Sequence, residues 1–507
     1  MWNAPVTPRR LPHWELVTLV ASLMALNAAA IDILIPALSS IGLALNVADE
    51  NSRQFVITAY VLGFGAAQIV YGTLSDRFGR RPVLLGGLAV YTLASIAAVF
   101  APSFAALLAL RAIQGIGAAA TRVVAVSIVR DQFDGRRMAS VMSIVMMIFM
   151  VIPVLAPNIG QAVMLFGSWP EIFMLVAAFG LAVSLWTLLR LPETLAPEDR
   201  IPLTVERVSG AFRTVVTNRL AFGYAIATAL IFGVLFAFIN QAEQLYTIVY
   251  GIGPEFTLYF SAVAILMAGV SFVNSQLVER YGMRRLAHSA LLGFVGLSIL
   301  HLGLTFAFGG VAPFWLFLPL LALTFCMFGL IGTNFNALAM DPLGHVAGTA
   351  SSVLGFTQTL GGGLLGAAVG YMFDGTAVPL LLGFVVLSLL SLGCVFWAEG
   401  GALFRSRYDR EAGVGRNAIY TNHRFALDEL ARARRAAARP VADTRRDRMV
   451  ELRSEIAALH ADRCRLATEN ASLVKRVLEA EARAAQLTQR VERLAQQLEH
   501  ARQRPAG

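Results

Sequence analysis

The sequence is poor in charged residues and almost free of lysine. Only 14% of its 507 residues are charged, against roughly 25% in a soluble protein, while 57% are hydrophobic. Residues 1–400 contain no lysine, and their 19 arginines accompany 18 acidic residues. The three cysteines, Cys326, Cys394 and Cys464, are too widely spaced for a paired metal or redox motif. These shortages exclude a large water-soluble enzyme and indicate a lipid bilayer as the solvent.

The net charge of +9 is concentrated beyond residue 400. Residues 401–507 carry 22 basic and 14 acidic side chains, whereas residues 1–400 are close to neutral. The chain therefore divides into a long apolar region and a polar, basic C-terminal tail.

The apolar region contains twelve segments of about 20 residues, the length at which a helix crosses a membrane. This pattern predicts an all-α membrane protein with twelve transmembrane helices. The expected spans are 14–38, 54–74, 83–101, 105–129, 138–162, 170–190, 219–241, 256–277, 286–308, 313–338, 347–371 and 377–398. The first span is too long for the core of a cleaved signal peptide, so we expect it to stay in the mature protein.

Arginine is distributed unevenly among the connections between these spans. Only Arg53 lies in an odd-numbered connection, whereas sixteen arginines lie in the even-numbered ones and at the N-terminus. The sixteen are Arg9, Arg10, Arg77, Arg80, Arg81, Arg130, Arg136, Arg137, Arg190, Arg200, Arg207, Arg213, Arg219, Arg280, Arg284 and Arg285. Because cytoplasmic loops are enriched in basic residues, this distribution predicts that both termini lie in the cytoplasm.

One motif occurs twice, 203 residues apart. The run GTLSDRFGRR at 72–81 is echoed by SQLVERYGMR at 275–284, and each copy closes the second span of a six-span half. Two pseudo-symmetric halves around a midplane site are typical of transporters. We expect an N-terminal half (1–198), a cytoplasmic inter-half loop (199–218), a C-terminal half (219–400), a basic linker (401–448) and a coiled coil (449–501).

Two ionisable residues fall inside expected spans, where charge is expensive and marks candidate function. Asp32 lies in the outer part of the first span, and Arg111 lies in the first turns of the fourth, so we expect them at similar depth. Burial favours a neutral carboxylate and a nearby guanidinium favours a charged one, so this pair could load and release a proton. The alternative is a permanent structural ion pair.

Arg122 follows Arg111 by eleven residues, about three turns, so it is expected to face the same cavity. The alternative is that the Arg122 side chain packs against backbone carbonyls or snorkels toward the membrane surface. Glu243, just beyond the seventh span, is a candidate for a second titrating or cation-attracting site, or else an exposed loop carboxylate. Further polar residues expected to line a substrate cavity are Tyr60, Gln68, Gln114, Asn158, Asn334, Asn336 and Gln358.

The end of the second span carries an ordered set of glycine, aspartate and arginine. Gly72 and Gly79 permit close helix approach and a tight turn, and Asp76 is placed to meet a helix N-terminus or an arginine. Such contacts would bias which side of a transporter is open, whereas the alternative is a simple positive-inside anchor. The candidate gate residues are Gly72, Asp76, Arg77, Gly79, Arg80 and, in the proline-bent fifth span, Pro157.

The sequence contains no phosphate-binding loop, no His-Glu metal helix and no nucleophile elbow. These absences argue against an enzyme, against a metal site and against transport powered directly by ATP. We expect no cofactor, and an ion gradient as the energy source.

The tail has a heptad pattern from Met449 onward, with leucine dominating one of the two core positions. This pattern favours a homodimer or docking of a protein partner, and the alternative is a marginal solvated helix. The arginine-rich linker is expected to touch anionic lipid headgroups. No recognition motif supports nucleic-acid binding.

Several of these motifs belong together. They are residues 72–82, residues 111–119 (RAIQGIGAA), AID at 30–32 with LIPAL at 34–38, and the runs at 128–131, 191–194 and 347–351. Over about residues 14 to 397 the sequence resembles the major facilitator superfamily, and within it the drug:proton antiporters of the bicyclomycin and chloramphenicol resistance type. The resemblance departs at 156–161, where only part of the fifth-span antiporter motif is kept, and at Arg122, where a small or neutral residue is expected.

The resemblance implies a multi-pass inner-membrane protein that exports small amphiphilic drugs in exchange for protons by alternating access. It also implies that Arg111 takes part in proton transfer. An anionic or zwitterionic substrate would suit the additional Arg122. Two other functions stay open: a symporter or importer of a small metabolite, and an interaction protein that works through its tail.

Overall fold

The computed structural model describes residues 11–133, 135–196, 198, 200 and 205–404. All regular secondary structure in these ranges is helical. The expected coiled coil at 449–501, and the linker beyond residue 404, lie outside the described residues. For that reason the homodimer or protein partner expected of the tail stays a prediction.

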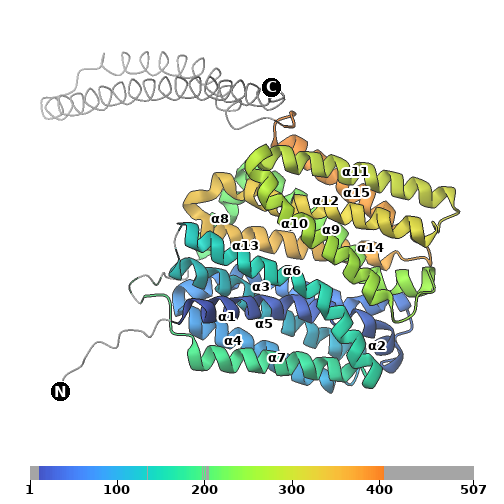
Figure 1. Cartoon of the computed structure of the whole chain (residues 1–507). Coiled ribbons are helices and arrows are strands. Elements are labelled where there is room, and N and C mark those ends of the chain that lie inside the picture. Colours follow the sequence, from blue (N-terminus) through green and yellow to red (C-terminus); the bar gives the residue numbers. More distant parts are fainter. Residues whose placement is uncertain (1–10, 134, 197, 199, 201–204, 405–507) are drawn as a thin grey trace, which may run out of the picture. The chain divides into compact units, whose positions relative to one another are not determined.

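The first helix group comprises α1 to α7 (Figure 1). Its elements are α1 (His13–Asp32), η1 (Ile35–Ala37), α2 (Leu38–Ala44), η2 (Glu50–Gln54), α3 (Phe55–Phe78), α4 (Arg80–Val99), α5 (Phe104–Gln132), α6 (Gly135–Phe166) and α7 (Trp169–Arg190).

A second helix group, α9 to α15, follows a short connecting helix, α8 (Val205–Thr217). The sequence analysis assigned the region of α8 to a polar loop. The elements of this group are α9 (Arg219–Gln244), η4 (Leu245–Val249), α10 (Phe256–Tyr281), α11 (Met283–Ala307), α12 (Phe314–Met340), η5 (Asp341–Val346), α13 (Ala347–Phe356), η6 (Thr357–Gly361), α14 (Gly362–Tyr371) and α15 (Val378–Ala398).

Eleven helices or helix runs in the described part of the chain are long and apolar enough to cross a membrane. Each coincides with one of the expected spans, with ends that differ by a few residues. The other expected span, 138–162, lies within α6, where the described residues supply a shorter apolar segment, Val151–Phe166. Exposed leucine, isoleucine and phenylalanine side chains on α4, α7, α10 and α15 suit contact with lipid.

The repeated motif has the same backbone conformation in both copies. Gly79 ends α3 with φ of +100°, and Gly282 ends α10 with φ of +79°. In both cases the next helix begins at the following residue. Positive φ is costly for any residue with a Cβ, so these glycines account for the tight turn that the sequence predicts.

The first span is broken about two-thirds of the way along its length. α1 ends at Asp32, and the chain continues through the 3-10 turn at Ile35–Ala37, which contains Pro36, into α2. Proline lacks an amide donor and restricts the residue before it, which explains why the helix stops here. Gly160 of α6 faces the break so closely that a Cβ on it would lie 2.0 Å from the carbonyl oxygen of Ile33.

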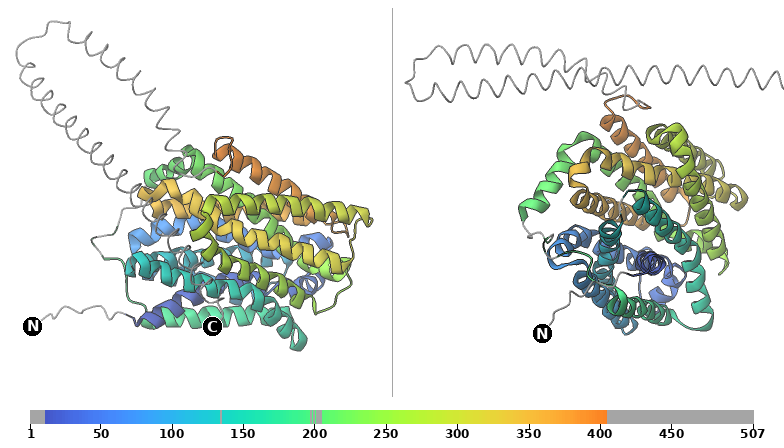
Figure 2. Two further views of the ribbon diagram at one scale, coloured as in Figure 1. Left: turned by 45° about the horizontal axis from the view of Figure 1, so that its top comes forward. Right: turned by 60° about the vertical axis from the view of Figure 1, so that its left-hand side comes forward.

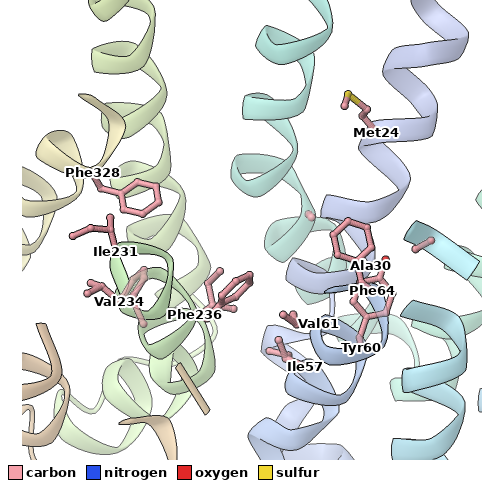
Figure 3. Close-up of a cluster of buried hydrophobic side chains, with 14 of the residues drawn as sticks. Met24, Ala30, Ile57, Tyr60, Val61, Phe64, Ile231, Val234, Phe236 and Phe328 are labelled. Carbon is pink, nitrogen blue, oxygen red and sulfur yellow. The ribbon is translucent and has the colours of Figure 1, made fainter. Parts of the chain in front are cut away.

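The two helix groups meet along α3, which packs against α13, η6 and α14, and along α6, which packs against α10. Figures 1 and 2 show the first group in blue to teal and the second in lime to orange, with their helices side by side. Figure 3 shows buried apolar side chains in two sets, one on α1 and α3 and the other on α9 and α12.

The second group contains two short π-helices: Leu245–Val249 ends the span that begins with α9, and Thr357–Gly361 interrupts a later span. The second stands in the middle of the glycine-rich span that faces α3. π-Helical turns occur most often at functional sites, so this interruption marks the α3 interface as a region of interest.

Candidate functional site

Asp32 is the last residue of α1 and is 4% exposed. Its Oδ1 atom is buried without a hydrogen-bond partner, and the carboxylate forms no ion pair with any residue in the described part of the chain. A buried carboxylate without a partner is costly when charged, which sets Asp32 apart as a candidate functional residue.

Arg111 is fully buried, and its donors are taken by groups other than Asp32. Nη2 donates to the Ala30 carbonyl at 3.0 Å, Nε donates to the Val56 carbonyl at 2.9 Å, and Nη1 donates to the side chain of Gln114. The contact with Ala30, two residues before Asp32, agrees with the similar depth expected for the pair. The permanent ion pair between them, which stood as the structural alternative, is absent.

The break in α1 explains this difference. The last carbonyls of a helix have no amide donor from a following turn, and Ala30 lies within the last four residues of α1. The guanidinium therefore satisfies a backbone carbonyl and ties α1 to α3 and α5. Arg111 fixes the position of the chain next to Asp32 without neutralising its charge.

Tyr60 and Gln114, which were expected to line a substrate cavity, belong to the same buried cluster as Arg111. The ring of Tyr60 lies 4.4 Å from the Arg111 guanidinium carbon, and its hydroxyl donates to Asn27 at 2.9 Å. The Gln114 amide donates to Ser95 at 2.7 Å. Both side chains are fully buried because they complete the coordination of a buried cation.

A cavity of about 150 Å³ lies between α3, α5 and α13, in the half of α3 that ends at Gly79. Gln68, Gly72, Asp76 and Arg122 line it, as expected for Gln68 and Arg122. Gly72 and Asp76, which were expected to act as gate residues, also line this cavity. The cavity is therefore bounded by both helix groups and by the gate motif.

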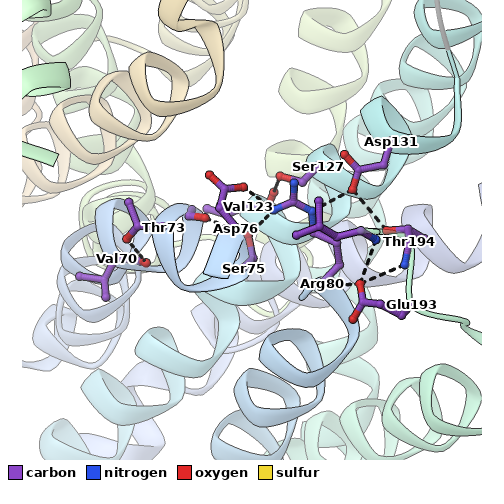
Figure 4. A network of polar contacts seen from close by, with 12 residues as sticks. Val70, Thr73, Ser75, Asp76, Arg80, Val123, Ser127, Asp131, Glu193 and Thr194 are labelled. Carbon is purple, nitrogen blue, oxygen red and sulfur yellow. Dashed lines mark hydrogen bonds and ion pairs between the residues drawn. The ribbon is translucent and has the colours of Figure 1, made fainter. Parts of the chain in front are cut away.

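The gate motif is built around Arg80, which is 3% exposed (Figure 4). Its Nη1 donates to Asp76 Oδ1 at 2.6 Å and to Ser75 Oγ at 2.8 Å, and its Nε donates to Asp131 Oδ2 at 2.8 Å. The expectation that Asp76 meets an arginine is confirmed. One cation thus joins the end of α3 to the end of α5.

Glu193, beyond the end of α7, closes the motif from the other side. Its carboxylate accepts hydrogen bonds from the backbone amides of Arg80, at 2.8 Å, and Arg81, at 3.3 Å. These amides belong to the first turn of α4, whose unpaired N–H groups attract negative charge. Thr194 donates to Asp131, which connects this carboxylate to the Arg80 cluster.

At the far end of α3 a set of hydrogen bonds joins the two helix groups; we call Ser39, Asn51, Glu243 and Gln244 the latch. The Ser39 amide donates to Glu243 Oε1 at 3.2 Å. The Asn51 side chain donates to the carbonyls of Tyr371 and Phe373, at 3.1 and 2.8 Å, and accepts from Gln244 at 3.1 Å. These hydrogen bonds tie the two helix groups together at this end.

Asp49 stabilises the loop that carries the latch. Partial burial acts to raise the pKa of its carboxyl, but hydrogen bonds from Asn51, Ser52 and Tyr371 outweigh burial and hold the pKa below its usual value. The carboxylate caps η2 by accepting the Asn51 amide at 3.0 Å.

The comparisons with known proteins agree with this geometry. The Major Facilitator Superfamily model matches residues 20–367. The chain belongs to the major facilitator superfamily. It is 30% identical over 372 residues to the "Bicyclomycin resistance protein homolog" of Haemophilus influenzae, which covers 71% of this chain and 91% of that protein. It is 31% identical over 385 residues to "Multidrug resistance protein MdtL" of Escherichia coli, covering 75% and 94%.

Solved structures support the same fold. The xylose transporter XylE of E. coli, in a partially occluded inward-open conformation, matches with a TM-score of 0.60 at 14% identity, over 77% of this chain and 98% of that chain. The human organic anion transporter MFSD10 matches with a TM-score of 0.59 at 19% identity, over 77% and 100%. This superfamily member is therefore a multi-pass membrane transporter of small molecules and not an enzyme.

Four other expected cavity residues of this transporter lie outside the cavity between α3, α5 and α13. Asn158 of α6 donates to Ser261 of α10 at 2.6 Å and so bridges the helix groups. Asn334 donates to Asn274 within the second group at 2.9 Å, and Asn336 donates to the carbonyl of its own helix neighbour Gly332. Gln358 is buried in the π-helix η6.

Glu243, Arg77 and Pro157 complete the candidate set. Glu243 is 6% exposed within α9, so its interpretation as an exposed loop carboxylate is wrong. Arg77 is exposed and contacts the ring of Phe78, outside the Arg80 cluster. Pro157 lies inside α6, one turn before Gly160, which faces the break in α1.

The sequence analysis did not assign roles to Asp131 and Glu193, although it noted both runs that contain them as family-like. It also missed a buried network in the second helix group. Tyr224 donates to Glu399 at 2.8 Å and contacts His288 Nε2 at 2.8 Å, while Arg284 donates to Glu399 at 3.1 Å. The signal available for this network was the repeat itself, because Arg284 closes its second copy.

Proposed function

We propose that this transporter exports small amphiphilic molecules, antibiotics among them, in exchange for protons by alternating access. The observation that carries the proposal is the asymmetry between the two ends of α3. The latch joins the helix groups at one end, while the cavity lies between them toward the other. The names of the relatives as resistance proteins support drugs as the cargo.

In this proposal the chain crosses the inner membrane twelve times, with α6 as the fifth span, and its two six-helix halves are related by the repeat. The ends carrying Arg80 and Arg284 lie in the cytoplasm together with both termini, in keeping with the distribution of arginine. The latch then lies on the outer side, and the structure corresponds to an inward-facing state.

Asp32 is the proposed proton carrier. It is buried at a helix break without a counter-ion, so loss or gain of a proton changes the local charge of the first span outright. Arg111 holds Ala30 and thereby positions this carboxylate. Protonation from the outer side would favour release of cargo outward, and deprotonation inward would restore affinity, because the two ligands weaken each other's binding.

The Arg80 cluster is the proposed inner gate. It fixes the ends of α3, α4 and α5 as one unit, so that the first helix group moves as a body when the halves rock. The cycle requires no cofactor, since the proton gradient supplies the energy.

The test is transport by purified protein in liposomes with an imposed pH gradient and a panel of amphiphilic antibiotics. Asp32→Asn should lower gradient-driven accumulation about tenfold or more, in line with typical coupling between linked sites. Exchange of labelled for unlabelled drug without a gradient should survive, which shows that the variant is folded.

The matched control is Asp374→Asn, a carboxylate exposed in the loop before α15. It should transport like the wild type. Gradient-driven accumulation that persists in Asp32→Asn would refute the coupling role of Asp32 while leaving the fold assignment intact.

A further inference from the structure

Arg122 is the first of the α5 residues that line the cavity. It lies ten residues before the end of that helix at Gln132, which corresponds to about 15 Å along the helix axis. The side chain is half-buried and lines the cavity together with Gln68 of α3 and Ser352 of α13. It is therefore placed between the two helix groups and well inside the span.

Arg122 forms no hydrogen bond and no ion pair with any residue that the structure describes. The other buried arginines differ in this respect. Arg80 holds two carboxylates, Arg284 holds Glu399, and the donors of Arg111 are met by two carbonyls and an amide. Arg122 is thus a cation whose donors are free to bind a ligand.

The cavity lining supplies no carboxylate that is left to pair with Arg122. Asp76 is its one carboxylate, and Arg80 already binds it at 2.6 Å. Arg130, exposed near the end of α5, adds a second positive charge along the wall. Charge of one sign in a confined space concentrates ligands of the opposite sign.

The dimensions and the remaining lining restrict the ligand further. About 150 Å³ accommodates a small head group, and is smaller than the pocket that encloses a whole drug-sized molecule. Ile69, Val123, Val126 and Val353 provide apolar walls beside the guanidinium. A planar carboxylate attached to an apolar group would accept hydrogen bonds from two nitrogens of the Arg122 guanidinium. Its first carbon atoms would then be buried against these valines.

We propose that Arg122 selects cargo by charge, and that the preferred substrates of this transporter are amphiphiles carrying a carboxylate. This inference rests on the proposed function of the cavity as a substrate route. Arg122 binds the anionic group in the inward-facing state, and neutral or cationic analogues of the same body lack that contact.

The test is equilibrium binding to the full-length protein in nanodiscs of phosphatidylcholine, which supplies no anionic headgroup. The probes are two matched pairs: chloramphenicol hemisuccinate with chloramphenicol, and dansylglycine with dansylglycinamide. Isothermal titration calorimetry gives the dissociation constants. The wild type should bind each carboxylate at least about tenfold more tightly than its neutral partner, as one charge-assisted pair allows.

Arg122→Gln should abolish this preference while leaving the affinity for the neutral partners within about twofold. Arg122→Lys should retain a reduced preference for the carboxylates, because lysine keeps the positive charge but cannot form the two parallel hydrogen bonds of a guanidinium. Arg285→Gln is the control, since it removes an exposed arginine of α11 that does not line the cavity, and it should keep the full preference.

Equal affinity of the wild type for both members of each pair would overturn the proposal, as would a carboxylate preference that persists in Arg122→Gln. If the carboxylate preference appears only in nanodiscs without anionic lipid, then lipid headgroups are the true occupants of the Arg122 site. That result would also overturn the proposal. Failure of the proposed function is distinguishable, because it would appear as loss of gradient-driven transport for every probe, charged or neutral.

Discussion

Gly79 shows how strongly a single position can depend on its neighbours. Its φ of +100° is accessible to glycine alone at low cost, and a Cβ there would lie 2.3 Å from Glu193 Oε2. Both constraints arise because the chain must turn sharply to present the first amides of α4 to that carboxylate.

Gly79→Ala should therefore lower the free energy of unfolding by about 1–3 kcal/mol through backbone strain, with displacement of Glu193 in addition. The measurement is the thermal unfolding midpoint of the purified protein. Gly86→Ala is the control, because Gly86 lies in the interior of α4 with no atom within 4 Å of an added Cβ. That change should leave the midpoint unchanged or raise it slightly, and equal losses in both variants would contradict the explanation.

Arg80 links the helices around it through its ion pairs. The side chain is buried, and the carboxylates that it holds come from α3 and from α5. Removing one partner of such a buried set leaves the other charges without compensation.

Arg80→Gln should destabilise the protein by about 3–5 kcal/mol, the range for breaking a buried pair. It should also reduce transport, because α3 and α5 lose their common anchor. Scanning fluorimetry and the liposome assay measure the two effects. Arg77→Gln, which removes an exposed arginine three residues away, should have little effect on either, and a comparable loss there would indicate a general charge effect instead.

The broken first span illustrates how an element can alter the chemistry of a site. A continuous helix would have satisfied the Ala30 carbonyl internally and left Arg111 available for Asp32. Because α1 ends at Asp32, the guanidinium binds backbone instead, and the carboxylate is left without a partner. An element boundary, set by the proline-containing turn that follows, thereby leaves this buried carboxylate without a counter-ion.

At the scale of the whole molecule, the latch joins the two helix groups at the end of α3 that lies far from the gate motif. Ser39 and Glu243 lie 204 residues apart, and the hydrogen bond between them crosses from one helix group to the other. In the proposed cycle, opening of this end would require this contact and those of Asn51 to separate.

Cysteines at both positions, Ser39→Cys with Glu243→Cys, should allow a short bifunctional thiol reagent to lock the two groups together. In a background in which the three native cysteines are replaced by alanine, the reagent should reduce transport to near the background rate. Each single-cysteine variant should keep its activity after the same treatment. Full transport by the cross-linked double variant would show that the latch does not open during the cycle.

The tail provides a prediction that separates two functions. A chain ending after residue 404 should still transport drug in liposomes if the helix groups form the complete exporter. Loss of transport, with the truncated protein still folded by thermal unfolding, would favour the interpretation as an interaction protein that works through residues 405–507.

The sequence by itself determined the membrane-spanning helices, because runs of apolar residues and the glycine-marked turns at 79 and 282 are local properties. It also predicted that Asp76 meets an arginine or a helix N-terminus, but the turn at Gly79 between α3 and α4 decided that Arg80 is its partner. It did not determine that Tyr60 and Gln114 serve Arg111, or that Glu243 meets Ser39. Those assignments depend on which faces of distant helices come together, and only the packing of the two helix groups decided them.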